Sequence, residues 1–149
     1  MKKLTVLLAA SALALAACST PAWNETDKYN ELCSTTPSLD PQLGALESVE
    51  APAGGHLQMS QFTGESVNIR VCTPATGDEL REYAEKLAIE VNKLPLAGQV
   101  ERMGVHSWPD DEAPEARISD DNFQMNLHDG GEAFENGAYR GAWEAVATE

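Results

Sequence analysis

The segment from Thr76 to Leu94, TGDELREYAEKLAIEVNKL, constrains the fold more than any other part of the chain. Its apolar residues recur at spacings of three and four, so that they share one face of an α-helix while charged residues fill the other face. Thr76 and Glu79 have the spacing of a capping box, and we expect Pro95 to end the helix. The segment predicts a long amphipathic helix that must bury one face against another layer.

Segments on both sides of this helix alternate apolar and polar residues, which is the pattern of strands with one buried face. In SVNIRVC, residues 66–72, the apolar side chains share one face and Cys72 points to the other. Alternation also predicts strands at 102–108 and 122–128, and the segment 138–147 reads as a closing strand or a short helix. Together these features favour an α+β fold, an antiparallel sheet with one long amphipathic helix packed on one face.

The region before the first clear strand is less regular. Prolines and a glycine pair punctuate residues 37–55. Leu39, Leu43 and Leu46 fit the inner side of a short helix, and Leu46 to Glu50 is interpreted as a short strand.

The N-terminus has the charge and length of a secretory signal, since Lys2 and Lys3 precede an apolar stretch from Leu4 to Ala17. The stretch is too short to span a membrane, because a spanning helix needs about 20 apolar residues. Its end, Leu15-Ala16-Ala17-Cys18, resembles the lipobox of bacterial lipoproteins.

The lipobox resemblance implies that the mature chain begins at Cys18, with diacylglycerol on its sulfur and usually an acyl group on its new amine. Two or more acyl chains anchor a protein stably to a membrane. We therefore expect a signal peptide at 1–17, a lipidated N-terminus and tether at 18–36, and one small α+β domain at 37–149, facing the extracytoplasmic side of the cell membrane. The alternative is an ordinary cleaved signal followed by a chance cysteine.

Cys33 and Cys72 remain once Cys18 is assigned to the lipid. An even pair of cysteines in an oxidising, exported compartment predicts a disulfide between them. Such a bridge would stabilise the fold by about 4 kcal/mol in the chain-entropy description. The alternative is a pair of buried thiols. Neither cysteine has a second cysteine or a histidine at metal-ligand spacing, which disfavours a metal role.

The charge of the chain restricts its partners. The formal net charge is -14, and removal of residues 1–17 makes it more negative because that segment holds two lysines and no acid. Such a surface argues against nucleic acid, which is bound mostly through lysine and arginine. We expect the chain to contact the membrane through the lipid on Cys18, and to meet a basic protein or a cell-wall component with its acidic surface.

Motifs for catalysis and cofactors fail on inspection. Gly64-Glu65-Ser66-Val67-Asn68 approaches the nucleophile motif G-x-S-x-G but lacks its last glycine. The acidic segments 110–112 and 120–122 do not fit the calcium loop of an EF-hand. The sequence therefore predicts a non-enzymatic binding or interaction module with no catalytic residue, no cofactor and no metal.

Three separated histidines, His56, His106 and His128, support the alternative of a small-ligand or metal-binding lipoprotein. His106 and His128 fall on the outward sides of expected strands. If these strands are neighbours, the two rings could bind zinc or copper together with Asp110 or Asp129.

Overall fold

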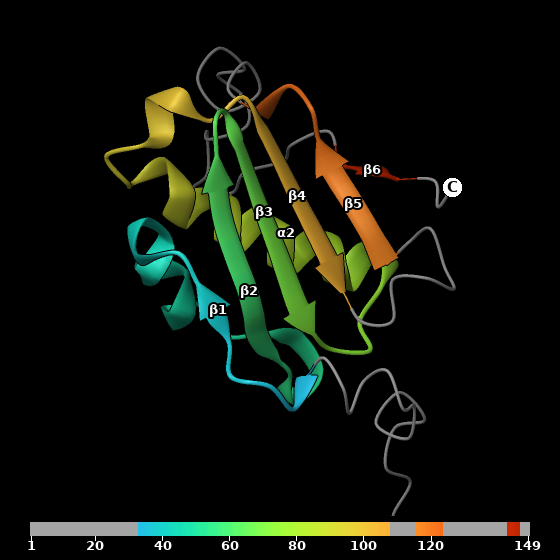
Figure 1. The fold of residues 1–149 in the computed structure, drawn as a ribbon. Coiled ribbons are helices and arrows are strands. Elements are labelled where there is room, and N and C mark those ends of the chain that lie inside the picture. The colour runs from blue at the N-terminus through green and yellow to red at the C-terminus, as the bar shows by residue number, and fades with distance from the viewer. Residues whose placement is uncertain (1–32, 108–115, 124–142, 147–149) are drawn as a thin grey trace, which may run out of the picture.

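A computed structural model describes residues 33–107, 116–123 and 143–146, and these form a sheet with helices behind it (Figure 1). The six strands of the described part lie side by side in the order in which they occur along the chain. They are β1 (Ser38–Leu39), β2 (His56–Thr63), β3 (Ser66–Cys72), β4 (Arg102–Ser107), β5 (Arg117–Asp120) and β6 (Glu144–Ala145). The helix α2 (Gly77–Asn92) crosses behind them, and the 3-10 helices are η2 (Pro41–Ser48), η3 (Pro52–Gly54) and η4 (Ala97–Gln99).

The expected fold class, an antiparallel sheet with one long helix on one face, is wrong. The sheet is mixed, because β1 runs parallel to β2 and β3 runs parallel to β4. The other neighbouring pairs are antiparallel. The physical reason is the connection: α2 carries the chain back across the sheet between β3 and β4, and a crossover of this kind joins parallel strands. In addition, α2 is not the one helix that packs against the sheet, since η2 contacts both α2 and β2.

The helix predicted at 76–94 is present as α2, which begins at Gly77 and ends at Asn92, before Pro95. The predicted capping box is wrong, because the Thr76 side chain makes no capping hydrogen bond. Gly77 has a φ of 56°, so the backbone enters the helix through a left-handed residue and lacks the regular first turn that a capping box requires. The acidic residues of the first turn still face the positive end of the helix dipole.

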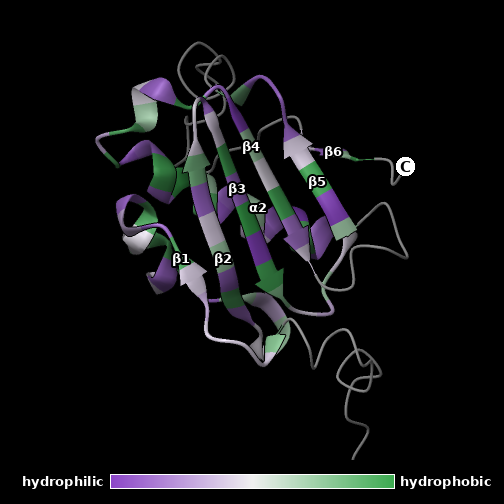
Figure 2. Cartoon of the chain, viewed as in Figure 1, coloured by the Kyte–Doolittle hydropathy of each residue, from purple (hydrophilic) through white to green (hydrophobic). Residues whose placement is uncertain are grey.

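The core lies between the sheet and its helices. Apolar residues alternate along β3, β4 and β5 (Figure 2), and their buried side chains meet the apolar face of α2 and two leucines of η2. Burying one such side chain stabilises a fold by about 1.5–3 kcal/mol. The main contributors are Leu43, Leu46, Val67, Ile69, Val71, Leu80, Leu87, Val91, Met103, Val105, Ile118 and Phe123.

The strand β2 has no counterpart among the sequence predictions. Its register shifts between Leu57 and Met59, which marks a bulge, and this extra residue breaks the simple alternation of HLQMSQFT. The short strand expected at 46–50 is wrong, because Pro41–Ser48 forms η2. The expected short helix is confirmed for Leu43 and Leu46, which η2 buries, but it is wrong for Leu39, which belongs to β1.

The predicted disulfide between Cys33 and Cys72 is formed, with 5.9 Å between the two Cα atoms. Cys72 is fully buried at the end of β3, and Cys33 is almost so. The side-chain amide of Gln58, which lies 4.0 Å from the Cys72 sulfur, donates a hydrogen bond to Thr35. The bridge therefore fastens the start of the described chain to the sheet.

Several predictions concern residues outside the described part. The signal peptide and Cys18 fall within 1–32, and most of the expected strand 122–128 falls within 124–142. Phe123, at the start of that expected strand, is buried in the core but belongs to no strand. Of the expected closing segment 138–147, residues 143–146 are described and contain β6.

Candidate functional site

The candidate site lies on the face of the sheet that points away from α2, which we call the open sheet face. Among the helices that the structure describes, none crosses in front of this face (Figure 1). It is formed by the outward side chains of three neighbouring strands, which alternate with the buried ones. The outward residues are Ser66, Asn68, Arg70, Arg102, Gly104, His106, Arg117 and Ser119.

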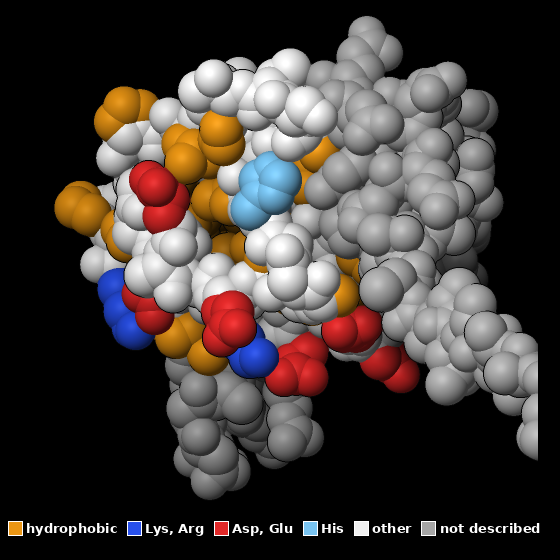
Figure 3. Space-filling model, turned by 90° about the horizontal axis from the view of Figure 1, so that it is seen from below, with side chains coloured by type: hydrophobic (Ala, Val, Ile, Leu, Met, Phe, Trp, Pro, Cys, Tyr) orange, Lys and Arg blue, Asp and Glu red, His pale blue; other side chains and the backbone are white. Residues whose placement is uncertain are grey.

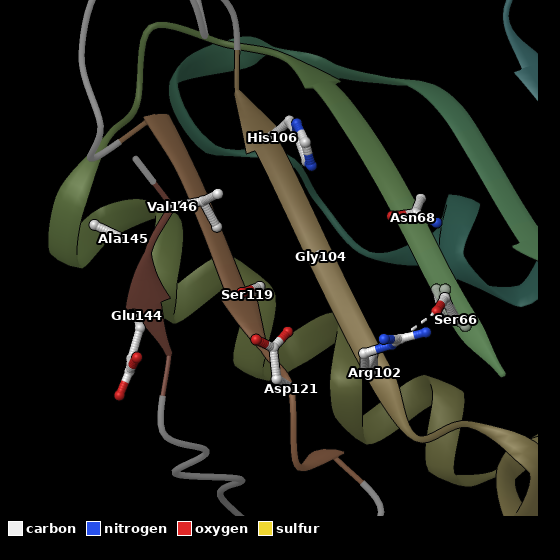
Figure 4. A pocket seen from close by; sticks show the side chains of 11 residues that line it. Ser66, Asn68, Arg102, Gly104, His106, Ser119, Asp121, Glu144, Ala145 and Val146 are labelled. Atoms are coloured by element: carbon white, nitrogen blue, oxygen red, sulfur yellow. Dashed lines mark hydrogen bonds between the residues drawn. The ribbon is translucent and has the colours of Figure 1, made fainter. Parts of the chain in front are cut away.

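A hollow of about 400 Å³ opens on this face around β4 (Figure 4). Its lining comes from β3, β4, the β5 end and β6, and consists of Ser66, Val67, Asn68, Arg102, Gly104, His106, Ser119, Asp121, Glu144, Ala145 and Val146. This volume falls within the range of about 300–1,000 Å³ that is usual for small-molecule sites.

Gly104 forms the floor of the hollow. It pairs with Asn68 on β3 and with Ser119 on β5, so the row has no large side chain at its centre. A Cβ atom added at Gly104 would lie 3.5 Å from Asn68 Oδ1 and 3.5 Å from His106 Nε2, which are ordinary contact distances. The hollow therefore exists because this position has no side chain, although the backbone has room for one.

The walls of the hollow carry opposite charges. On one side, the Arg102 guanidinium donates from Nε to Ser66 Oγ at 3.2 Å and from Nη2 to Glu65 Oε1 at 3.3 Å. On the other side, the lining includes Asp121 from the β5 end and Glu144 from β6, and the Glu144 carboxylate points away from Gly104 (Figure 4). The arrangement can receive a ligand that has both a positive and a negative group.

A row of basic side chains runs beside the hollow. The register pairs Arg70 with His106 and His106 with Arg117, so three basic residues are cross-strand neighbours on the open sheet face. The Arg117 Nε is buried and has no hydrogen-bond partner in the described part of the chain. The row therefore places two arginine side chains on this face of an acidic protein.

A pair of carboxyl groups lies next to Arg102. The backbone N–H groups of Glu101 and Arg102 both donate to the Glu65 carbonyl, at 2.8 and 3.2 Å. A hydrogen bond and charge repulsion from the Glu65 side chain raise the pKa of Glu101, and the positive charge of Arg102 opposes this shift. Glu101 therefore holds its proton more readily than an isolated glutamate.

Of the metal site that the sequence suggested, only His106 lies in the described part of the chain, so its pairing with His128 stays a prediction. His106 lines the hollow and pairs with Arg70 on one side of β3, whereas His56 pairs with Cys72 on the other side of that strand. His128, Asp110 and Asp129 lie outside the described residues. Within residues 33–107, 116–123 and 143–146, no group of three histidine, cysteine, aspartate or glutamate side chains is placed to hold a metal ion.

Sequence reasoning missed the hollow, although one signal for it was present. A glycine in the interior of an alternating strand often marks a close approach of a ligand or of another backbone, and Gly104 occupies such a position. The other lining residues come from strands whose pairing the sequence pattern did not give.

Comparison of the chain with protein-family models, with curated proteins and with solved structures finds no match. These comparisons supply nothing positive for or against an enzymatic activity. In the part of the chain with described structure, no helix has both the length and the apolar character needed to cross a membrane.

Proposed function

We propose that the chain is a lipid-anchored extracytoplasmic binding module that holds a polar ligand in the hollow over Gly104. The anchor rests on the lipobox-like Leu15-Ala16-Ala17-Cys18. The ligand site rests on one observation, the glycine floor between the Arg102 wall and the wall formed by Asp121 and Glu144.

The ligand class follows from the charges. With a formal net charge of -14, the chain repels a purely anionic ligand at long range. A purely cationic ligand would meet Arg102 and the basic row. A zwitterion satisfies both walls, and the side chains of Asn68 and Ser119 offer further hydrogen bonds within the hollow.

Short cell-wall peptides have this chemistry, since they carry amino and carboxylate groups on one small chain. An extracytoplasmic lipid anchor would keep the domain close to them. We therefore propose a cell-wall peptide as the ligand of the hollow.

The test compares the full chain, purified in a non-ionic detergent, with a variant whose hollow is filled. Gly104→Leu should weaken binding of a soluble disaccharide-tetrapeptide by at least about tenfold, because a leucine side chain would occupy the floor. Gly44→Leu is the matched control, since Gly44 is exposed on η2 and a Cβ there meets no atom within 4 Å.

Calorimetric titration measures both affinities, and thermal melting verifies that each variant is folded. The disaccharide without its peptide should bind far more weakly. Equal affinities for the wild type and Gly104→Leu, or equal binding of the disaccharide and the disaccharide-tetrapeptide, would contradict the proposal.

A further inference from the structure

Arg102, which lines the hollow over Gly104, is already paired with an acidic side chain of the chain itself. Glu65 Oε1 accepts a hydrogen bond from Arg102 Nη2 at 3.3 Å, and the two side chains are about half exposed. Seen from below, the molecule also carries acidic side chains next to basic ones (Figure 3). Three ion pairs along α2 and its C-cap join residues three or four positions apart. The pair of Arg102 and Glu65 instead joins residues 37 positions apart, at the edge of the hollow.

The backbone fixes the position of Glu65. Gly64 and Glu65 form the two-residue loop between β2 and β3, and Gly64 has a φ of 64°. The Glu65 carbonyl accepts hydrogen bonds from the N–H groups of Glu101 and Arg102, which ties this loop to the start of β4. The Glu65 side chain takes no part in these backbone bonds, so it can be changed without removing them.

Ser66 and Glu65 occupy one edge of the Arg102 guanidinium. A guanidinium binds a carboxylate most strongly through two parallel N–H groups, and Nε and Nη2 offer such a pair. In Arg102 the Nε atom donates to Ser66 Oγ (Figure 4), and the Nη2 atom donates to Glu65 Oε1. A ligand carboxylate that binds this edge must therefore displace Glu65.

We infer that Glu65 is an internal competitor for Arg102, and that it lowers the affinity of the hollow for a ligand carboxylate. The inference rests on the proposed function, since the ligand is the peptide held over Gly104. Ion pairs between exposed side chains are weak, so a ligand carboxylate can replace Glu65. The displaced Glu65 still repels a carboxylate bound beside it.

Glu65 is thus a specificity-determining residue of the hollow. Because it opposes binding of a negative group, a purely anionic ligand gains little from Arg102. A zwitterion gains in addition from its positive group, which the Asp121 side of the hollow attracts. The competition therefore favours zwitterionic ligands over anionic ones.

The experiment is a calorimetric titration of the full chain in a non-ionic detergent. The two probes are the disaccharide-tetrapeptide and the same compound with its carboxylates converted to amides. Glu65→Gln should raise the affinity for the unmodified compound by about threefold, the size of the effect of an exposed ion pair. It should not raise the affinity for the amidated compound, which has no carboxylate to compete with Glu65.

Glu101→Gln is the matched control, since the Glu101 side chain lies beside Glu65 and carries the same charge. This variant keeps the bond between Glu65 and Arg102, so it should change the affinity much less. In an Arg102→Gln chain, Glu65→Gln should bring no gain, because the competition requires the guanidinium. Thermal melting verifies that each variant is folded.

The outcomes separate this inference from the proposed function. If the wild type binds the peptide and Glu65→Gln brings no gain, the inference is wrong and the proposed function stands. An equal gain in Glu101→Gln, or a gain that persists in the Arg102→Gln chain, would show that Glu65 acts by charge alone and would also overturn the inference. If neither the wild type nor Glu65→Gln binds the peptide, the proposed function is refuted and the inference with it.

Discussion

At the scale of single residues, Gly104 is the position where local stability and the proposed function conflict. Its φ is not in the left-handed region, and a Cβ atom there would make only ordinary contacts. Neither the backbone nor the packing therefore requires glycine at this point of β4. Glycine within a strand costs about 0.5–1 kcal/mol relative to alanine. In compensation for this cost, the absence of a side chain at Gly104 leaves the space of the hollow.

Gly104→Ala should raise the free energy of unfolding by about 0.5–1 kcal/mol and weaken binding of the cell-wall peptide. The added methyl group removes the entropic cost of glycine and occupies part of the floor. Chemical denaturation and peptide titration on the same preparation measure both effects. A destabilised variant with unchanged peptide affinity would contradict this view of Gly104.

Glu101→Gln should change how stability depends on pH. Glu65 raises the pKa of Glu101 in the folded chain, so the folded state holds that proton more tightly than the unfolded state does. The wild type therefore loses stability as the pH rises from the unfolded pKa through the higher folded pKa, and the variant lacks this loss. Between pH 4 and pH 7, the melting temperature of the wild type should therefore fall relative to the melting temperature of the variant. A constant difference across this range would disprove the effect.

At the scale of elements, Asp40 joins η2 to the edge of the sheet. Its carboxylate accepts hydrogen bonds from the backbone N–H of Gln42 at 2.9 Å and of Phe62 at 3.0 Å. These two bonds cap the start of η2 and hold it to β2. They also lower the pKa of Asp40, the bond from Phe62 contributing most.

Asp40→Asn should lower the melting temperature at neutral pH, because the two N–H groups bond to different carboxylate oxygens and an amide has only one oxygen to accept them. For a lowered pKa, the stabilising contribution is present above the unfolded pKa and is lost as the pH falls through the folded pKa. The difference between variant and wild type should therefore shrink in acid. A difference that stays the same down to pH 2 would contradict this role of the charged carboxylate.

The elements also show what sequence patterns can predict. Periodicity located α2, β3 and β4, because each of these elements buries one face. The spacing of the apolar residues along the sequence shows which face is buried. Periodicity did not predict whether neighbouring strands are parallel or antiparallel, because the alternation of buried and exposed residues along a strand is the same in both arrangements. β2 was missed because its bulge breaks the alternation. The hollow was missed because its residues meet only through the pairing of β3, β4, β5 and β6.

At the scale of the whole molecule, two cysteine features organise the chain. Cys33 and Cys72, 39 positions apart, tie the start of the described structure to the sheet. Cys18 is the proposed lipid attachment point. The bridge leaves only the segment between Cys18 and Cys33 as a spacer between the proposed anchor and the domain.

Replacing both bridged cysteines by serine should lower the free energy of unfolding by about 4 kcal/mol, because the unfolded chain gains the freedom of the opened loop. Denaturation of the full chain in detergent measures the loss. In the wild type, alkylation of the unfolded, unreduced chain should find neither Cys33 nor Cys72 reactive. Two reactive thiols at these positions would contradict the bridge.

Cys18→Ala should abolish incorporation of labelled fatty acid and leave the precursor uncleaved by the lipoprotein pathway. The variant tests the anchor separately from the hollow, because Cys18 lies far along the sequence from every lining residue. A variant that still carries lipid would show that the lipobox assignment is wrong.

The most direct test of the binding-module proposal is a map of where the peptide binds. Isotope-labelled full chain in detergent micelles is titrated with the disaccharide-tetrapeptide, and backbone amide shifts are followed by NMR. We predict that the largest changes occur at Asn68, Gly104 and Ser119, the row that forms the floor of the hollow. Shifts confined to α2 and η3, or no shifts at saturating peptide, would contradict a binding site on the open sheet face.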